Sequence, residues 1–139
     1  MITTGLALWP LRKAVYDALT THDEMRGQNV KVDNKQAAYP YAAIAQIAMS
    51  QDDVDAFGGT YMVTVEVWGQ KSNGGTLDVN TLMDKVALAL GDELALESPF
   101  NCAQFQGIMQ AMIGDFYDQQ NMQELVLGSI TFKYFVVED

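Results

Sequence analysis

The sequence predicts an α+β fold, in which an antiparallel sheet of about four to five strands has two helices packed on one face. Two stretches, 6–21 and 76–90, repeat apolar residues every three or four positions, as amphipathic helices do. Residues 61–68 alternate between apolar and mixed side chains, which is typical of a half-buried strand. Because further strand-like stretches lie between and after the helices, we expect both helices on the same side of one sheet.

The strand over 61–68 is the centre of the predicted sheet. Successive side chains of a strand point to opposite faces, so one face of this strand is entirely apolar. That face comprises Tyr61, Val63, Val65 and Val67. β-Branched and aromatic residues fill the run and glycines lie just outside both of its ends. We expect the apolar face to pack against the helix over 76–90.

Each predicted helix has one apolar stripe. In the first helix the stripe comprises Leu8, Leu11, Val15, Ala18 and Leu19. In the second helix it comprises Val79, Leu82, Met83, Val86 and Leu90. Pro10 suits the first turn of the first helix, where its missing N–H costs nothing. Thr76 is the expected N-cap of the second helix, and Gly91 is the expected C-cap.

The remaining strands are less regular. Residues 29–33 are expected to form a short edge strand and residues 41–50 a longer one. Strict alternation along the longer strand would place one set of side chains on a single face: Tyr41, Ala43, Ala45, Ile47 and Met49. Residues 103–115 alternate only loosely. After a polar turn over 116–121, the last strand covers 123–137, with Gly128 as the expected site of a bulge.

Composition indicates one domain over residues 1–139 and excludes several classes of protein. The net charge is −10 and the eight Lys and Arg residues are scattered, so nucleic-acid binding through phosphates is not expected as the main function. The acidity either keeps the chain soluble or makes a surface that repels DNA. No apolar run approaches the ~18 residues that span a bilayer, and the N-terminus has no basic region, so we expect neither a membrane partner nor a signal peptide.

Residues for catalysis are missing, and we therefore expect no enzyme activity, no cofactor and no metal. The one histidine, His22, lies near the end of the first predicted helix, and the one cysteine, Cys102, has no histidine nearby in the sequence. A single cysteine also excludes an internal disulfide and fits a reducing cytoplasm. The glycine pair at 74–75 is not followed by the Lys-Ser/Thr pair of a phosphate loop, and no His/Cys cluster has metal-ligand spacing.

The predicted loop over 51–59 holds the candidate residues for a subunit interface. These are Asp52, Asp53, Val54, Asp55 and Phe57. The loop is longer than two adjacent antiparallel strands require, and long loops are often functional. A solvated loop does not need the apolar residues Val54 and Phe57, and their presence favours contact with a neighbouring subunit. The alternative is an acidic loop that is simply solvated.

Five stretches together resemble the tail-completion proteins, also called tail-terminator or head–tail joining proteins, of long-tailed bacteriophages, prophages and gene transfer agents. The similarity covers most of the chain and depends on the order and spacing of a first helix, a Pro-Tyr pair before an apolar strand, a strand that ends in Trp68, a second helix and a final strand. These stretches are 11–19, 39–44, 63–68, 82–86 and 128–134. Residues 93–123 do not match the family pattern.

The resemblance implies a structural virion protein without catalytic residues. Such proteins form a ring, commonly of six copies, that caps the tail tube at the neck, contacts the tail tube protein and the neck or head-completion proteins, and lets DNA pass through its lumen without specific binding. They are assembled in the host cytoplasm and end in the virion. Two alternatives remain open from the sequence: a neck adaptor or head-closure component, and a free α+β domain that binds a small ligand or a protein.

Overall fold

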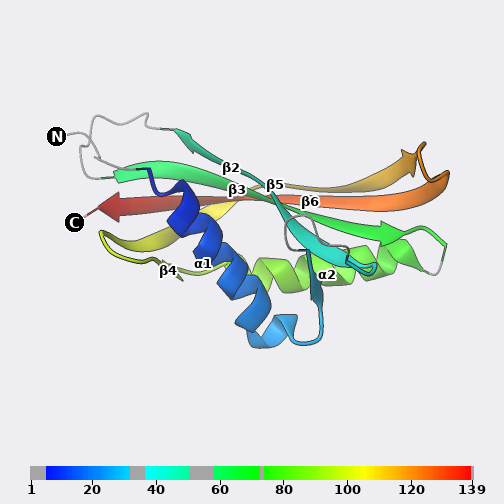
Figure 1. Ribbon diagram of the computed structural model, residues 1–139, viewed down its shortest axis with the longest axis horizontal. Coiled ribbons are helices and arrows are strands. Elements are labelled where there is room, and N and C mark those ends of the chain that lie inside the picture. Colours follow the sequence, from blue (N-terminus) through cyan, green and yellow to red (C-terminus); the bar gives the residue numbers. More distant parts are fainter. Residues whose placement is uncertain (1–5, 32–36, 51–57, 73, 139) are drawn as a thin grey trace.

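The computed structural model describes residues 6–31, 37–50, 58–72 and 74–138 (Figure 1). It contains two α-helices, one short 3-10 helix and six strands within those residues. In chain order they are α1 (Leu8–Thr21), η1 (Asp23–Met25), β1 (Asn29–Val30), β2 (Tyr41–Ser50), β3 (Gly58–Gln70), α2 (Gly75–Leu90), β4 (Leu94–Ala95), β5 (Phe100–Asp118) and β6 (Gln123–Glu138). Both α-helices lie on the same side of the sheet, as predicted (Figure 1).

The strands form one strongly curled sheet in the order β1-β2-β3-β6-β5-β4. The four long strands are antiparallel to their neighbours, whereas β1 runs parallel to β2. The expectation of four to five strands in a purely antiparallel sheet is therefore wrong in two respects: the sheet has six strands and is mixed. The short edge strand expected at 29–33 is present as β1, although it covers only Asn29–Val30 and runs parallel to β2. β4 was not predicted, because a strand of two residues is too short for a periodic pattern.

The predicted apolar stripes of both helices lie in the core. On α1, the residues Leu11, Val15 and Leu19 are fully buried, while Leu8 and Ala18 pack against the core at its border. On α2, all five predicted stripe residues are buried. The first helix begins at Leu8 rather than at residue 6, and Pro10 lies in its first turn as expected.

The start of α2 differs from the prediction. The residue at its N-cap is Gly74, with a φ of 71°, and not Thr76. Gly75 then approaches the end of β3 so closely that a Cβ on it would lie 1.8 Å from the carbonyl oxygen of Gln70. The glycine pair thus serves a left-handed cap and a close contact between helix and strand, two features that only glycine allows here. The expected C-cap, Gly91, is confirmed.

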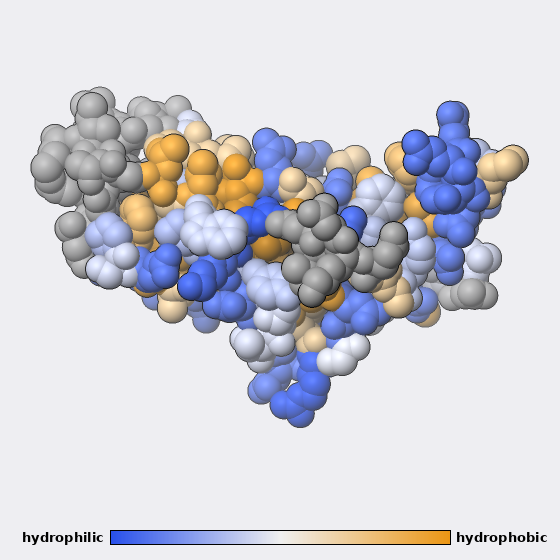
Figure 2. Space-filling view, viewed as in Figure 1, coloured by the Kyte–Doolittle hydropathy of each residue, from blue (hydrophilic) through white to orange (hydrophobic). Residues whose placement is uncertain are grey.

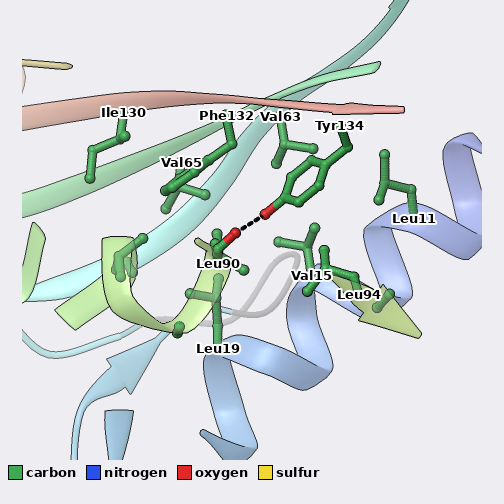
Figure 3. Close-up of a cluster of buried hydrophobic side chains, with 14 of the residues drawn as sticks. Leu11, Val15, Leu19, Val63, Val65, Leu90, Leu94, Ile130, Phe132 and Tyr134 are labelled. Carbon is green, nitrogen blue, oxygen red and sulfur yellow. Dashed lines mark hydrogen bonds between the residues drawn. The ribbon is translucent and has the colours of Figure 1, made fainter. Parts of the chain in front are cut away.

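The core lies between the helices and the helix-facing side of β3 and β6. All four predicted residues of β3, from Tyr61 to Val67, are at most 2% exposed. Every second residue of β6 joins them: Val126, Ile130, Phe132, Tyr134 and Val136. Figure 3 shows Ile130, Phe132 and Tyr134 pointing from the sheet toward the side chains of α1 and toward Leu90 of α2. These contacts confirm the predicted apolar face of β3, and β6 adds its own buried face beside it.

Two tyrosine hydroxyls in the core have backbone partners. Tyr134 donates a hydrogen bond to the carbonyl oxygen of Leu90 (Figure 3), and the Tyr61 hydroxyl accepts one from the N–H of Ala7 at 2.9 Å. Burial raises the pKa of Tyr134 far above its ordinary value because the phenolate would be desolvated. The hydroxyls therefore tie the sheet to the end of α2 and to the segment just before α1 without leaving a buried polar atom unpaired.

Two predictions about strand regularity fail in opposite directions. β2 carries an irregularity between Ile44 and Gln46, so the residues that face the core change from Ala42 and Ile44 to Ile47 and Met49. The strict alternation predicted for this strand is therefore wrong. Gly128, by contrast, pairs regularly on both sides, and a Cβ on it would lie 2.3 Å from the sulfur of Met83. This glycine makes room for α2 and marks no bulge.

The face of the sheet that points away from the helices is called the open face below. It carries the side chains that alternate with the core set, including Met62, Thr64, Glu66 and Trp68 of β3. These side chains are half-buried. The hydroxyls of Thr64 and Thr131 lie 3.0 Å apart across β3 and β6. No helix in the described part of the chain is long and apolar enough to cross a membrane.

Candidate assembly interface

Strand β5 has one end in the core and one end in solvent. Near its start, Phe100 and Ala103 are buried, and the ring of Phe105 lies 5.8 Å from that of Tyr134. No described side chain of β5 beyond Phe105 is buried. The β5–β6 turn forms the right-hand tip of the molecule in Figure 1. The strand is longer than the predicted 103–115, and the turn is correspondingly shorter than the predicted 116–121.

Six large apolar side chains lie in solvent along this outer part of β5, and together they are called the β5 strip. Their exposed fractions range from 41% to 58%. The strip comprises Ile108, Met109, Met112, Ile113, Phe116 and Tyr117. Single exposed apolar residues are ordinary, but a continuous set of this kind marks an interaction surface.

The β5 strip is apolar on both faces of the strand. Ile113 pairs with Gly128 and therefore lies on the helix-facing side, whereas Met112 pairs with Ser129 and lies on the open face. Two irregularities, near Gly107 and between Ile108 and Gln110, interrupt the loose alternation predicted for this stretch. An antiparallel strand with one solvated face normally alternates between apolar and polar residues, whereas a strand buried on both faces is continuously apolar. Between residues 108 and 117 the charged or amide side chains are limited to Gln110 and Asp115, so this part of β5 is nearly as apolar as an interior strand although it lies in solvent.

The outer edge of β5 is also open. Among the described residues, β4 pairs with Cys102 and Ala103, and beyond that point β5 pairs on one side only, with β6. An edge of this kind presents unpaired backbone N–H and C=O groups, and proteins usually protect it with charged side chains, proline or bulges. Residues 104–114 contain no charged residue and no proline. The two irregularities lie in the first half of the strand, and the pairing from Gln110 to Asp118 is regular.

Specific contacts hold the outer part of the hairpin in place. The rings of Trp68 and Phe116 meet edge to face at 5.2 Å, and Lys71 Nζ binds Asp115 Oδ2 at 2.9 Å. The hydrogen bond and the charge of Asp115 raise the pKa of the Lys71 ammonium. At the turn, Asp118 accepts hydrogen bonds from the backbone N–H groups of the two residues at 120 and 121. The β5 strip is thus presented on an ordered strand.

A second apolar edge lies at the opposite side of the sheet, on β2. β1 pairs only with Tyr41 and Ala42, and Lys31 adds a hydrogen bond to the carbonyl oxygen of Ala42. From Ala43 to Met49 the described part of the chain pairs β2 with β3 alone. This stretch has no charged residue, and Figure 2 shows hydrophobic side chains gathered over it at the upper left.

A groove of about 580 Å³ runs beside the β2 edge. Its wall includes Arg12 and Lys31, together with the aromatic rings of Tyr41 and Trp68. The Lys31 ammonium lies 6.0 Å from the centre of the Tyr41 ring, a cation–π distance. Burial, and then the neighbouring Tyr39 and Glu66, raise the pKa of Tyr41. Two of the eight cationic side chains of this acidic protein therefore lie next to the same open edge.

The interface residues proposed from the sequence, Asp52, Asp53, Val54, Asp55 and Phe57, lie outside the described residues. Their role as an interface remains a prediction. The β5 strip was not identified as an interface from the sequence. The available signal was the charge-free run over 104–114, in a protein of which 19% of residues are charged.

The single histidine has a structural role at the end of a helix. His22 follows α1, and its Nδ1 accepts a hydrogen bond from the N–H of Glu24 at 3.1 Å. It is therefore a helix-end residue, as expected. Within the described ranges, no group of three or more His, Cys, Asp or Glu side chains could hold a metal ion.

Comparison with known proteins identifies relatives by structure and not by sequence. No family model matches the chain, and no curated protein matches its sequence. The fold is similar to that of a chain in a solved structure described as the virion of a native gene transfer agent (GTA) particle, with a TM-score of 0.70 and 17% identity. The similarity covers 96% of this chain and 99% of the other. The two proteins share a fold over nearly their whole length.

Proposed function

We propose that this chain is a structural subunit of a phage-like virion, and specifically a tail terminator, or tail completion protein, that forms a ring at the head–tail junction. The ring caps the tail tube and lets DNA pass through its lumen. The observation that carries the proposal is the β5 strip, whose strand is apolar on both faces and open along its edge. The fold shared with a chain of a gene transfer agent virion supports the same class of function.

The β5 strip favours assembly over a free-standing domain. Burial of apolar surface stabilises a protein by about 25 cal/mol per Å². The six large side chains of the strip are roughly half exposed in the monomer, so an interface that covers them would gain this stabilisation. A small-ligand site would instead be concave, with a few converging polar groups. The strip is an extended strand, which fits a protein partner or another copy of the chain.

The charge of the protein suits a passage for DNA. The net charge of −10 disfavours binding to phosphate, so DNA would not adhere to the ring as it moves. On the open face, the described residues 60–70 of β3 carry one charged side chain, Glu66, and residues 125–137 of β6 carry one, Lys133. The sheet itself therefore offers no basic track for a nucleic acid.

The test is the behaviour of the purified protein alone and in the presence of tail tubes. We expect ring-shaped particles by negative-stain electron microscopy and native mass spectrometry, and we expect the protein at one end of each tube. A protein that stays monomeric at high concentration and leaves tube ends unoccupied would contradict the proposal.

A neck adaptor or head-closure component is the second candidate, because the matching solved structure is a whole virion and its description names no position within the particle. Mixing the protein separately with headless tails and with tailless heads distinguishes the two roles. A terminator binds the tails first, whereas an adaptor binds the heads first.

A further inference from the structure

We propose that the outer edge of β5 pairs with the outer edge of β2 of a second copy of this chain, so that the sheet continues from one subunit into the next. The proposal rests on the proposed function in one respect only, namely that copies of the chain assemble. It assigns the contact to two defined strands and gives its direction. The stretches concerned are residues 104–112 of one copy and residues 43–49 of the next.

Strand direction makes these two edges compatible. The long strands follow the order β2-β3-β6-β5, and each runs antiparallel to its neighbour. With four alternating strands, the two outermost, β2 and β5, run in opposite directions. Two copies in the same orientation therefore bring β5 of one against β2 of the next as an antiparallel pair. Because each copy then uses both edges, the contact is head-to-tail, which is the kind that closes into a ring.

The two open edges also lie at the same height of the sheet. Ala43 shares a row with Glu66, Ser129 and, on β5, Met112. At the other end, Ser50 shares a row with Thr60, Phe135 and Gln104 of β5. A neighbour related by a simple rotation thus places its β2 edge opposite the free part of β5, without a large shift along the strands.

Neither edge carries the charge or the proline that commonly protects an edge strand. The stretches 43–49 and 104–114 contain no charged residue and no proline, and their protection is limited to one irregularity in β2 and two in the first half of β5. A two-fold contact between two β5 strands would satisfy one edge and leave the apolar β2 edge of both copies unpaired. The head-to-tail contact satisfies both edges at once.

Charge at the end of the contact fits the same arrangement. Beyond the row of Tyr41, β1 occupies the β2 edge, so the end of β5 passes beside β1 and the neighbouring groove. That end carries Asp115, which Lys71 of the same copy already pairs, and Asp118, while the groove carries two cations, Arg12 and Lys31, and the carboxylate of Glu66. Opposite charges at the rim of a contact guide its orientation.

Single lysines on each edge test the proposal. Met112→Lys places a charge on β5, and Ala48→Lys places one on the exposed face of β2. The matched control is Leu88→Lys on α2, since Leu88 and Met112 are 59% and 58% exposed. We expect both strand variants to fold, as shown by circular dichroism, and to sediment as monomers at concentrations where the wild type and the control form rings.

Mixing the two variants gives the decisive result. Met112→Lys retains a normal β2 edge and Ala48→Lys retains a normal β5 edge, so an equimolar mixture should form heterodimers and nothing larger. Assembly of Ala48→Lys to wild-type size would overturn the proposal, because it would mean that β2 is not used, although the ring function could stand. A wild-type protein that never assembles would instead contradict the proposed function itself.

Hydrogen exchange separates strand pairing from contact through side chains alone. In rings compared with the monomeric variants, we expect slower amide exchange in the peptides that cover 43–49 and 104–112, because edge N–H groups gain partners. Unchanged exchange in both peptides would overturn the strand pairing even if the residues prove to lie in an interface.

Discussion

β5 and β6 are adjacent strands of one hairpin, yet their environments differ along most of their length. In β6, every second side chain from Val126 to Val136 is buried, because β3 and β5 flank the strand and α2 covers it. In β5, burial stops at Phe105, although the apolar side chains continue to Tyr117. The difference shows that apolar content alone does not decide which strand forms the core. Cover by a neighbouring element decides it, and for the outer part of β5 we propose that this cover comes from another subunit.

The largest effect is expected from Ile130→Asp on β6, compared with Ala111→Asp on β5. The two residues pair with each other, so they share a row and a face of the sheet. Ile130 is 2% exposed, and an aspartate there would be a buried, unpaired charge that costs about 4 kcal/mol or more. Ala111 is exposed, and its variant should stay within about 0.5 kcal/mol of the wild type. Urea unfolding of both variants checks the contrast, and equal losses would mean that β5 is as buried as β6.

A smaller loss is expected from Gly128→Ala on β6, with Gly114→Ala on β5 as its control. The new methyl group at 128 would meet Met83 of α2, whereas nothing lies within 4 Å of a Cβ at 114. Overpacking of this kind costs about 1–3 kcal/mol. Thermal unfolding should show a lower Tm for the first variant only. If Gly114→Ala lost as much stability, the space beside β5 would be filled already in the monomer.

Tyr134→Phe on β6 should cost about 1–2 kcal/mol, because the carbonyl oxygen of Leu90 loses its donor. Tyr117→Phe, which removes an exposed hydroxyl of β5, should cost nothing measurable.

The raised pKa of Tyr134 adds a dependence on pH. The folded state holds the phenolic proton more tightly than the unfolded state, so this contribution to the free energy of unfolding is complete below pH 10.0 and declines as the pH rises above it. The Phe variant should lose less stability than the wild type over that alkaline range.

The smallest effect is expected from Asp115→Asn, which breaks the ion pair with Lys71. Both side chains are largely in solvent, where such pairs contribute little to stability. We expect an unchanged Tm, while the pKa of Lys71, measured by NMR, should fall toward its ordinary value. A clear loss of Tm would show that the outer hairpin depends on this pair to remain attached to β3.

Local patterns in the sequence determined the elements that touch the core. The alternation over 61–68 and the stripes of the two helices predicted buried faces that the structure confirms, because a buried face repeats with the period of its own element. The final strand was predictable for the same reason.

Tertiary structure alone decided the features that depend on two elements at once. A glycine is needed at position 128 because the sulfur of Met83, far away in the sequence, leaves no room for a side chain there. The irregularity in β2 follows from the pairing of β2 with β3. The β5 strip is the clearest case, since its residues fit a strand buried on both faces. Only the strand order shows that β5 has β6 on one side and, beyond Ala103, no neighbour in the described chain on the other. A sequence records which side chains avoid water, whereas the arrangement of the strands determines which of them the monomer leaves exposed.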